Sequence, residues 1–182
     1  RTGLAGAGRL LMIRYRDADP ADGPAIDAMG RAVWIETFGH SVSAEDMALY
    51  LSEAYGPAGT LRRDLADPAH RFRLACAGPA IVGYAKLSDP WLPAGTFGPR
   101  AKQLSQLYVV AAQRGAGVAQ ALMDWAIATA RAGGADELVL TVWEENPRAQ
   151  RFYDRQGFVY VADYAFKTGN QIDRDLIMRL AL

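Results

Sequence analysis

The chain has few of the residues that form disulfides and zinc sites. It contains one cysteine, Cys76, and two histidines, His40 and His70, among 182 residues. A lone cysteine cannot form an internal disulfide, and these residues do not supply the ligand cluster of a zinc site. We therefore expect no bound metal and a reducing compartment, the cytoplasm.

The chain also lacks an excess of charge of either sign. Lysine and arginine number 20, as do aspartate and glutamate, so the formal net charge is zero. Proteins that bind nucleic acid or lie on anionic membranes need a surplus of cations. Neither nucleic acid nor a membrane is therefore expected as a partner, and any charged ligand must be met by local residues.

Long apolar runs are missing as well. No run approaches the ~20 residues of a transmembrane helix. The segment 1–11, RTGLAGAGRLL, lacks the sustained apolar stretch of a signal peptide, and we expect it to be a leader or tail outside the fold. With 51% apolar residues, the remainder, 12–182, is expected to form a single domain around one core.

Apolar periodicity and turn residues divide the chain into strands and helices. Strands are expected at 12–18, 71–77, 80–87, 103–110, 137–142, 158–164 and 173–180, and helices at 21–38, 43–55, 59–65, 115–131 and 147–156. Ser43 is the expected N-cap of the second helix, and the proline-rich segment 88–100 is an expected surface loop. An early meander followed by strands that alternate with helices predicts an α/β fold, a mixed sheet covered by helices.

The stretch YVVAAQRGAGVAQALMDWAI, residues 108–127, leads from a strand through two glycines into a helix. The first-turn amides of a helix have no intrahelical partners and carry the positive end of the helix dipole. Small residues at 115–117 and 119 would let a bulky anion approach these amides, which predicts a phosphate site. A bare Gly-x-Gly equally permits tight packing of a strand against a helix.

Two familiar phosphate loops fit this stretch poorly. A P-loop needs a lysine and a serine or threonine after its glycine, and no lysine follows here. A dinucleotide-binding fingerprint needs a third glycine where Gln120 stands, and an acidic residue at the end of the next strand, where the chain has Val142 and Trp143.

A third pattern matches. Arg114-x-x-Gly117-x-Ala119 resembles the Arg/Gln-x-x-Gly-x-Gly/Ala signature of the GNAT superfamily of acyl-CoA-dependent N-acetyltransferases. Downstream, LTVWEENPRAQRFYDRQGF resembles the second signature of that family, carried here by Asn146, Ala149, Phe152, Tyr153, Gly157 and Phe158. From Met12 onward, ETFGH, EDMALYLSEAY, IVGYAKL, TVWEEN and DLIMRL resemble the bacterial polyamine acetyltransferase (PaiA-like) group.

The resemblance implies a fold, a cosubstrate and a set of binding residues. The fold is a mixed, mostly antiparallel sheet of about seven strands, splayed between the fourth and fifth, and the cosubstrate is acetyl-CoA. The implied cofactor-binding residues are Leu107, Tyr108 and Val109 for the pantetheine arm, Arg114, Gly115, Ala116, Gly117, Val118, Ala119 and Gln120 for the pyrophosphate, and Asn146 and Tyr153. Asn146 also fits a helix N-cap before Pro147, and both roles can hold at once.

Tyr153 is the candidate catalytic acid that the resemblance implies. Transfer from a thioester to an amine expels a thiolate, and a phenol within hydrogen-bond reach of the sulfur can protonate it. The alternative is core packing beside Phe152. Adjacent helix positions point ~100° apart, so Phe152 can face the core while Tyr153 faces the cofactor cleft.

The base is less clear from the sequence. Some members of the family carry a glutamate base at the position of Thr141, and a threonine hydroxyl cannot act as a base near neutral pH. Glu36 is the candidate base or ammonium-binding residue, and a solvated surface carboxylate is the alternative. The candidate acceptor-binding residues are Trp34, Glu36, Phe38, His40, Tyr50 and Thr141. Aromatic residues at helical spacing equally fit a core, as does Cys76.

The expected acceptor is a primary amine of a small molecule, attacked directly in a ternary complex. Members of the PaiA-like group carry glutamates on the fourth strand where this chain has the neutral Gln103 and Ser105, which disfavours a polycationic acceptor. A protein or peptide amine is an alternative acceptor, and a non-catalytic acetyl-CoA-binding regulator or a nucleotide-binding module is an alternative function. A homodimer is left open.

Overall fold

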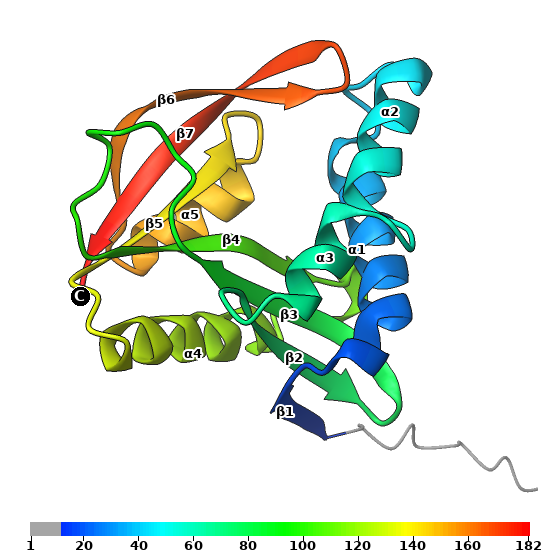
Figure 1. Cartoon of the computed structure of the whole chain (residues 1–182), viewed down its shortest axis with the longest axis horizontal. Helices are drawn as coiled ribbons and strands as arrows, with labels where there is room; N and C mark the ends of the chain where they lie inside the picture. Colours follow the sequence, from blue (N-terminus) through cyan, green and yellow to red (C-terminus); the bar gives the residue numbers. More distant parts are fainter. Residues whose placement is uncertain (1–11) are drawn as a thin grey trace, which may run out of the picture.

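The structure is a computed structural model that describes residues 12–182; the expectation for residues 1–11 lies outside this range. The strands are β1 (Ile13–Asp17), β2 (Arg71–Ala77), β3 (Ala80–Ser88), β4 (Ala101–Val109), β5 (Glu137–Trp143), β6 (Val159–Thr168) and β7 (Gln171–Ala181). The helices are α1 (Gly23–Phe38), α2 (Ala44–Ala54), α3 (Thr60–Ala66), α4 (Val118–Ala132) and α5 (Pro147–Arg155) (Figure 1).

These strands form one sheet in the order β1-β2-β3-β4-β5-β7-β6. Neighbouring strands are antiparallel, except that β4 and β5 run parallel. The predicted fold class, a mixed and mostly antiparallel sheet of about seven strands flanked by helices, is confirmed.

The central strands β4 and β5 pair over a short distance only. Their ladder joins Ala101–Gln103 to Glu137–Val139. Beyond it β4 continues to Val109 and β5 continues to Trp143, so the two strands diverge. The predicted splay between the fourth and fifth strands is confirmed.

A β-bulge in β4 gives a physical reason for this divergence. Leu104 and Gln106 pair with the consecutive residues Leu87 and Lys86 of β3, which leaves Ser105 as an extra residue. A bulge bends its strand and increases the local twist. Because Ser105 lies only two residues after Gln103, the last residue of β4 that pairs with β5, the bulge turns the rest of β4 away from β5.

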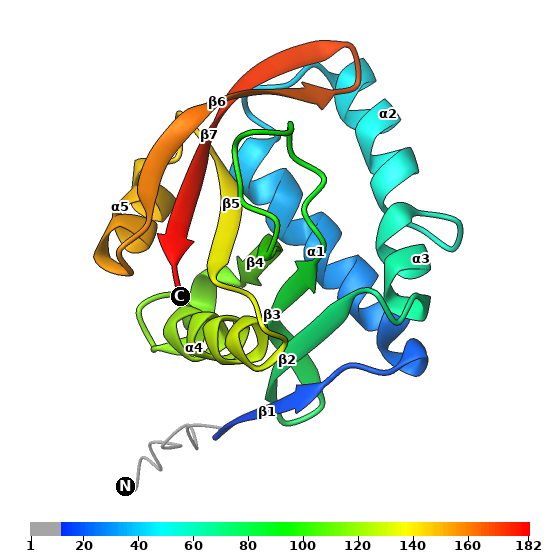
Figure 2. The same cartoon turned by 60° about the vertical axis from the view of Figure 1, so that its left-hand side comes forward.

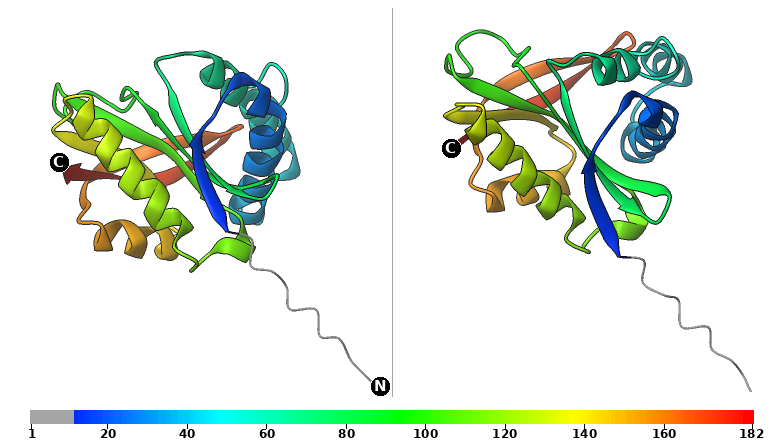
Figure 3. Two further views of the ribbon diagram at one scale, coloured as in Figure 1. Left: turned by 90° about the horizontal axis from the view of Figure 1, so that it is seen from below. Right: turned by 60° about the horizontal axis from the view of Figure 1, so that its bottom comes forward.

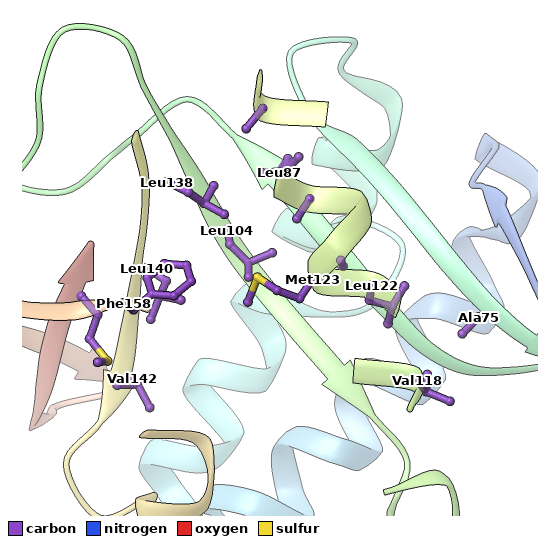
Figure 4. Close-up of a cluster of buried hydrophobic side chains, with 14 of the residues drawn as sticks. Ala75, Leu87, Leu104, Val118, Leu122, Met123, Leu138, Leu140, Val142 and Phe158 are labelled. Carbon is purple, nitrogen blue, oxygen red and sulfur yellow. The ribbon is translucent and has the colours of Figure 1, made fainter. Parts of the chain in front are cut away.

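Helices cover the two faces of the sheet differently. Figure 3 shows α4 and α5 on one face, and α1, α2 and α3 on the other. Under α4, a core cluster joins Leu122 and Met123 of the helix to Leu104, Leu138 and Leu140 of the strands (Figure 4). The second cluster, under α1, contains Ile26, Trp34, Leu74, Tyr84 and the predicted core residue Cys76.

Strand β5 divides its side chains between these faces. Successive side chains of a strand point to opposite faces. Leu138, Leu140 and Val142 are buried in the cluster under α4. Thr141 and Trp143 therefore face the side of α1 and α2.

The β6–β7 hairpin extends beyond the sheet to α2 (Figure 1). At its turn the amide of Asn170 donates a 2.6 Å hydrogen bond to the carboxylate of Asp46 in α2. Figure 2 shows the loop between β3 and β4 inside the arch that the hairpin forms with α1 and α2. The side-chain oxygen of Gln103 accepts a 3.1 Å bond from the amide of Trp91, which ties this loop to β4.

One helix start agrees with the sequence prediction, and another differs where glycines have positive φ. The predicted N-cap Ser43 is confirmed, since its hydroxyl oxygen accepts a 3.1 Å bond from the amide of Asp46. The helix expected from residue 115 begins at Val118, because Gly115 and Gly117 have φ of 78° and 82°. Within residues 12–182, no helix has the length and apolar character needed to cross a bilayer.

Candidate active site

A cavity of about 890 Å³ occupies the gap between β4 and β5. Its loop end is lined by Arg114, Gly115, Gly117, Ala119 and Gln120, and by Arg148, Tyr153 and Arg155 of α5. Its hairpin end is lined by Tyr50 of α2, Trp91 of the β3–β4 loop, Phe166 of β6 and Asp175 of β7. The cavity thus connects the two faces of the sheet through the splay.

The diverging part of β4 forms the wall between these ends. Leu107, Tyr108 and Val109, predicted to bind the pantetheine arm, all line the cavity. They lie beyond Gln103, where pairing with β5 ends. An extended ligand with amide groups can add to such a strand edge through main-chain hydrogen bonds.

Main-chain amides dominate the loop end. The amide of Ala121 bonds to the carbonyl of Gly117 at 3.0 Å and closes the first turn of α4. The amides of residues 117–120 are therefore first-turn donors that need a partner from outside the helix. A Cβ atom built on Gly115 or Gly117 would have no heavy atom within 4 Å, so the space beside this backbone is open. Such a cradle fits a phosphate group.

The other predicted loop residues contribute in different ways. Ala119 and Gln120 line the cavity, whereas the side chain of Val118 is 1% exposed and belongs to the core cluster under α4. Ala116 is exposed. For Val118 and Ala116, only the main chain is therefore placed for binding.

Arginines concentrate positive charge at the loop end. Arg114 donates a 2.7 Å hydrogen bond to the carboxylate of Glu36. Burial and, after it, the charge of Arg114 lower the pKa of Arg148. Arg155 lines the same end. Although the net charge of the chain is zero, the loop end is thus a local region that attracts anions.

Sequence reasoning missed Arg148 and Arg155. The available signal was the repeated arginine in PRAQRFYDR, residues 147–155. Arginines on a helix surface are common, and the sequence alone does not show which of them faces a cavity.

Asn146 is the N-cap of α5, and that alternative is confirmed. Its side-chain oxygen accepts a 3.2 Å bond from the amide of Ala149. Asn146 also lines the cavity, which leaves room for the predicted contact with a cofactor arm.

Tyr153 lies in the wall of the cavity at the loop end. Its ring packs against Phe152 and Phe158, with centroids 5.5 Å and 5.8 Å away. Burial raises the pKa of Tyr153, so its hydroxyl keeps its proton at neutral pH. Phe152 lines the cavity as well, so both rings combine core packing with a place in the wall.

The six predicted acceptor residues separate into two groups. Trp34, Phe38, Tyr50 and Thr141 line the large cavity. Glu36 and His40 line a smaller pocket of about 180 Å³ beside Arg114 and Trp143. The ring of His40 lies 5.8 Å from that of Trp143 in a tilted arrangement, and Arg114 binds the carboxylate of Glu36. Sequence reasoning had placed all six around one site.

A chain of aromatic contacts follows the wall toward the hairpin end. Trp34 stacks on Tyr50 with centroids 4.5 Å apart, and Tyr50 lies 6.1 Å from Phe166. Tyr164 lies 6.4 Å from Phe166 and 5.6 Å from Trp91. Aromatic faces attract cations as well as apolar groups.

Asp175 is the residue at the hairpin end that sequence reasoning missed. It is 8% exposed, lines the cavity and pairs across the sheet with Trp143. Burial raises the pKa of Asp175 to about 6, an effect that a hydrogen bond from Thr141 partly offsets. The available signal was an aspartate directly before the apolar run LIM at 176–178, because a carboxylate is rarely buried inside a strand without a reason.

The neutral residues of the fourth strand have distinct positions. Gln103 is 1% exposed and holds the loop at Trp91. Ser105 lines the cavity, and its hydroxyl lies 2.5 Å from that of Ser88. Gln103 therefore has a structural role, and Ser105 adds a neutral polar group to the cavity wall.

Comparison with known proteins gives a consistent result. The model of the acetyltransferase (GNAT) family matches residues 32–158. A protein of Lactobacillus delbrueckii subsp. lactis, named an uncharacterized N-acetyltransferase, is 26% identical over 88% of this chain and 92% of its own length. An uncharacterized N-acetyltransferase of Mycobacterium tuberculosis is 36% identical over 63% of this chain and 69% of its own length.

A solved structure with the same fold contains a bound cofactor. The crystal structure of PaiA N-acetyltransferase from Thermoplasma acidophilum, in complex with coenzyme A, superposes with a TM-score of 0.72. It is 19% identical and covers 94% of this chain and 99% of its own.

Proposed function

Because this chain belongs to the GNAT acetyltransferase family, we propose that it transfers the acetyl group of acetyl-CoA to a primary amine of a small molecule. The observation that supports this proposal most directly is the cavity. It joins a main-chain anion cradle, a protonated tyrosine and an aromatic, acidic chamber within one continuous space between two diverging strands.

The loop end fits coenzyme A. The first-turn amides of α4 and the guanidinium groups of Arg114 and Arg148 suit a pyrophosphate. The diverging edge of β4 at residues 107–109 suits the amides of a pantetheine arm. The arm would then place the thioester beside Tyr153, and the bound cosubstrate supplies the activated acetyl group.

Tyr153 would act on the leaving group. When the amine nitrogen bonds to the acetyl carbon, the carbon–sulfur bond breaks and the sulfur leaves as a thiolate. The phenol of Tyr153 gives its proton to that sulfur. Burial raises the pKa of Tyr153, so the hydroxyl carries its proton at every pH near neutrality and has it available to donate.

The hairpin end supports a small amine as the acceptor. Its walls come from α2, α3, the β3–β4 loop and the β6–β7 hairpin, so the chamber is bounded on several sides. The turn of the hairpin is tied to α2 through Asn170 and Asp46. Aromatic rings and the carboxylate of Asp175 both favour a cation, which is the form of a primary amine at neutral pH.

A thiol-release screen tests the proposal. The purified full chain is mixed with acetyl-CoA and a panel containing a polyamine, amino acids, an aminoglycoside and a peptide with a free N-terminus. We expect thiol release that depends on at least one small amine, with one acetylated amine formed for each thiol. Release with the peptide alone would favour a protein acceptor, and binding without release would favour a non-catalytic regulator.

Cofactor binding is tested by thermal unfolding. Acetyl-CoA should raise the melting temperature, because a ligand that binds only the native state stabilises it. NAD and ATP should have little effect. Equal stabilisation by NAD would contradict the assignment of the loop end to coenzyme A.

A further inference from the structure

An amine acceptor must lose a proton before it can attack, and the hairpin end contains a carboxylate placed for that step. We propose that Asp175 accepts the proton of the acceptor's ammonium group, an inference that rests on the proposed amine acetylation. It replaces Glu36 in this role, because the carboxylate of Glu36 is bound by Arg114 beside the smaller pocket.

The position of Asp175 follows from the sheet register. Asp175 pairs with Trp143, and Ile177 pairs with Thr141. Residues directly opposite on neighbouring strands share a face, so Asp175 lies on the same face as Thr141 and Trp143. That face is the one turned away from α4, toward the chamber at the hairpin end. Asp175 thus stands one strand away from Thr141 and on the cavity wall.

Its surroundings suit a base. Thr141, on the neighbouring strand, interacts with the carboxylate and lowers its pKa in part. Burial raises the pKa of Asp175 to about 6, so the group is ionised at neutral pH and yet holds a proton better than an exposed aspartate. Proton transfer is most effective when the pKa of the base lies near the working pH.

Other ionisable groups at the hairpin end are engaged or differently placed. Tyr50 faces Asp175 from α2, and burial raises the pKa of Tyr50 to about 12, so it stays neutral. The carboxylate of Asp173, on the same strand, accepts bonds from Thr168 and Gln171.

The far wall of the chamber carries a separate charged cluster. There Asp64 of α3 binds the ammonium of Lys86 and lies 3.8 Å from His70. Glu53 of α2 and Lys167 of β6 are exposed residues that also line the cavity. Asp64 is therefore neutralised by Lys86, whereas the neighbour that lowers the pKa of Asp175 is the uncharged Thr141.

The proton balance of the reaction closes with two residues. The ammonium group has three protons, and the amide product keeps one. One proton passes to Asp175 and then to solvent. The third proton returns to Tyr153, in place of the proton that Tyr153 gives to the leaving sulfur.

The pH dependence of Asp175→Asn tests this role. For the wild type, kcat/KM should fall as pH drops through about 6 and should level off above it. The variant should be slower by roughly 10²-fold or more at pH 7.5, the range of a lost general base. Its rate should keep rising toward the pKa of the free amine, about 10, because only the neutral amine can then react.

A matched variant and a second readout make the result decisive. Asp163→Asn removes an exposed carboxylate of the same hairpin, outside the cavity, and should retain the wild-type rate and profile. A variant Asp175→Asn with the wild-type plateau and rate would overturn the inference and leave the proposed function standing.

The second readout does not need turnover. In protein with ¹³C-labelled aspartate carboxyl groups, the signal missing from Asp175→Asn identifies Asp175. Adding CoA and each amine of the panel should shift the Asp175 titration to lower pH, because a bound ammonium favours the carboxylate. An unchanged titration with every amine would overturn the inference, whether or not thiol release is observed.

Discussion

The two ends of the cavity are built in different ways. The loop end uses two short segments, 114–120 and 146–155, and much of its binding capacity comes from main-chain amides. The hairpin end collects side chains from segments as distant as Trp34 and Asp175. One end therefore recognises a ligand through local backbone geometry, and the other through side chains that only the complete fold brings together.

The difference separates two kinds of specificity. A main-chain cradle tolerates many side-chain changes as long as its glycines remain, so it suits a ligand shared by a whole family. Side chains at the hairpin end can change singly, so they suit a ligand that varies. Variants at each end should accordingly affect cofactor affinity or amine chemistry, and not both.

Tyr153→Phe should give the largest effect, because Tyr153 is the residue proposed to protonate the leaving sulfur. The ring and its packing remain, while the leaving thiolate loses its proton donor. Turnover should fall by roughly 10²-fold or more under single-turnover conditions, with the acetyl-CoA affinity nearly unchanged. Tyr160→Phe, at an exposed position on β6, is the matched control. If Tyr153→Phe reacts at the wild-type rate with both a poor and a good amine, Tyr153 contributes only to packing.

Asp175→Asn should stabilise the protein at pH 7.5 while it slows the reaction. The pKa of Asp175 is raised in the fold from 3.8 to about 6, so the native state binds more protons than the unfolded state between these values. Stability therefore decreases as pH rises through this window, and the cost of the buried charge is complete above it. Removing the charge should add about 2–3 kcal/mol to the free energy of unfolding at pH 7.5.

The corresponding melting temperature should rise by about 4–12 °C, and the difference should disappear near pH 4. Asp163→Asn is the control and should change the melting temperature in the opposite direction. A hydrogen bond from Arg174 lowers the pKa of Asp163, so the fold favours its ionised form. Equal melting temperatures for Asp175→Asn and the wild type at pH 7.5 would mean that the buried charge of Asp175 does not destabilise the fold.

Gly117→Val should weaken acetyl-CoA binding by tenfold or more. The new side chain points into the open space beside the first-turn amides, where the pyrophosphate is expected. A left-handed residue with a side chain also costs stability, roughly 1–2 kcal/mol. Gly134→Val separates the two effects, because Gly134 has nearly the same φ, 81° against 82°, equally open space, and a position after α4 outside the cavity. Similar CoA affinities for the two variants would show that the pyrophosphate does not bind beside Gly117.

Arg148→Gln should give the smallest effect. Loss of one partly exposed guanidinium should reduce CoA affinity a few-fold, about 0.5–1 kcal/mol, and the reduction should shrink at high salt. Arg151→Gln, on the exposed face of the same helix, should leave the affinity unchanged. Isothermal titration at low and high ionic strength measures both.

Local patterns made the fold and much of the loop end predictable. Helix and strand periodicity predicted the order of elements, and Arg114-x-x-Gly117-x-Ala119 marked the start of α4 within three residues. The bulge at Ser105 was not predictable, because it exists only in the register between β3 and β4. The pair of Glu36 and Arg114 joins residues 78 positions apart, and Asp175 meets the cavity only through its pairing with β5.

The most direct test of the two-ended cavity is a crystal structure of the protein with a conjugate that links coenzyme A to the best amine of the panel. We expect the pyrophosphate on the amides of residues 115–120, the sulfur within hydrogen-bond reach of the Tyr153 hydroxyl, and the amine between Tyr50 and Asp175. A pyrophosphate bound away from this loop, or an amine that enters the smaller pocket beside Glu36 instead, would contradict the account.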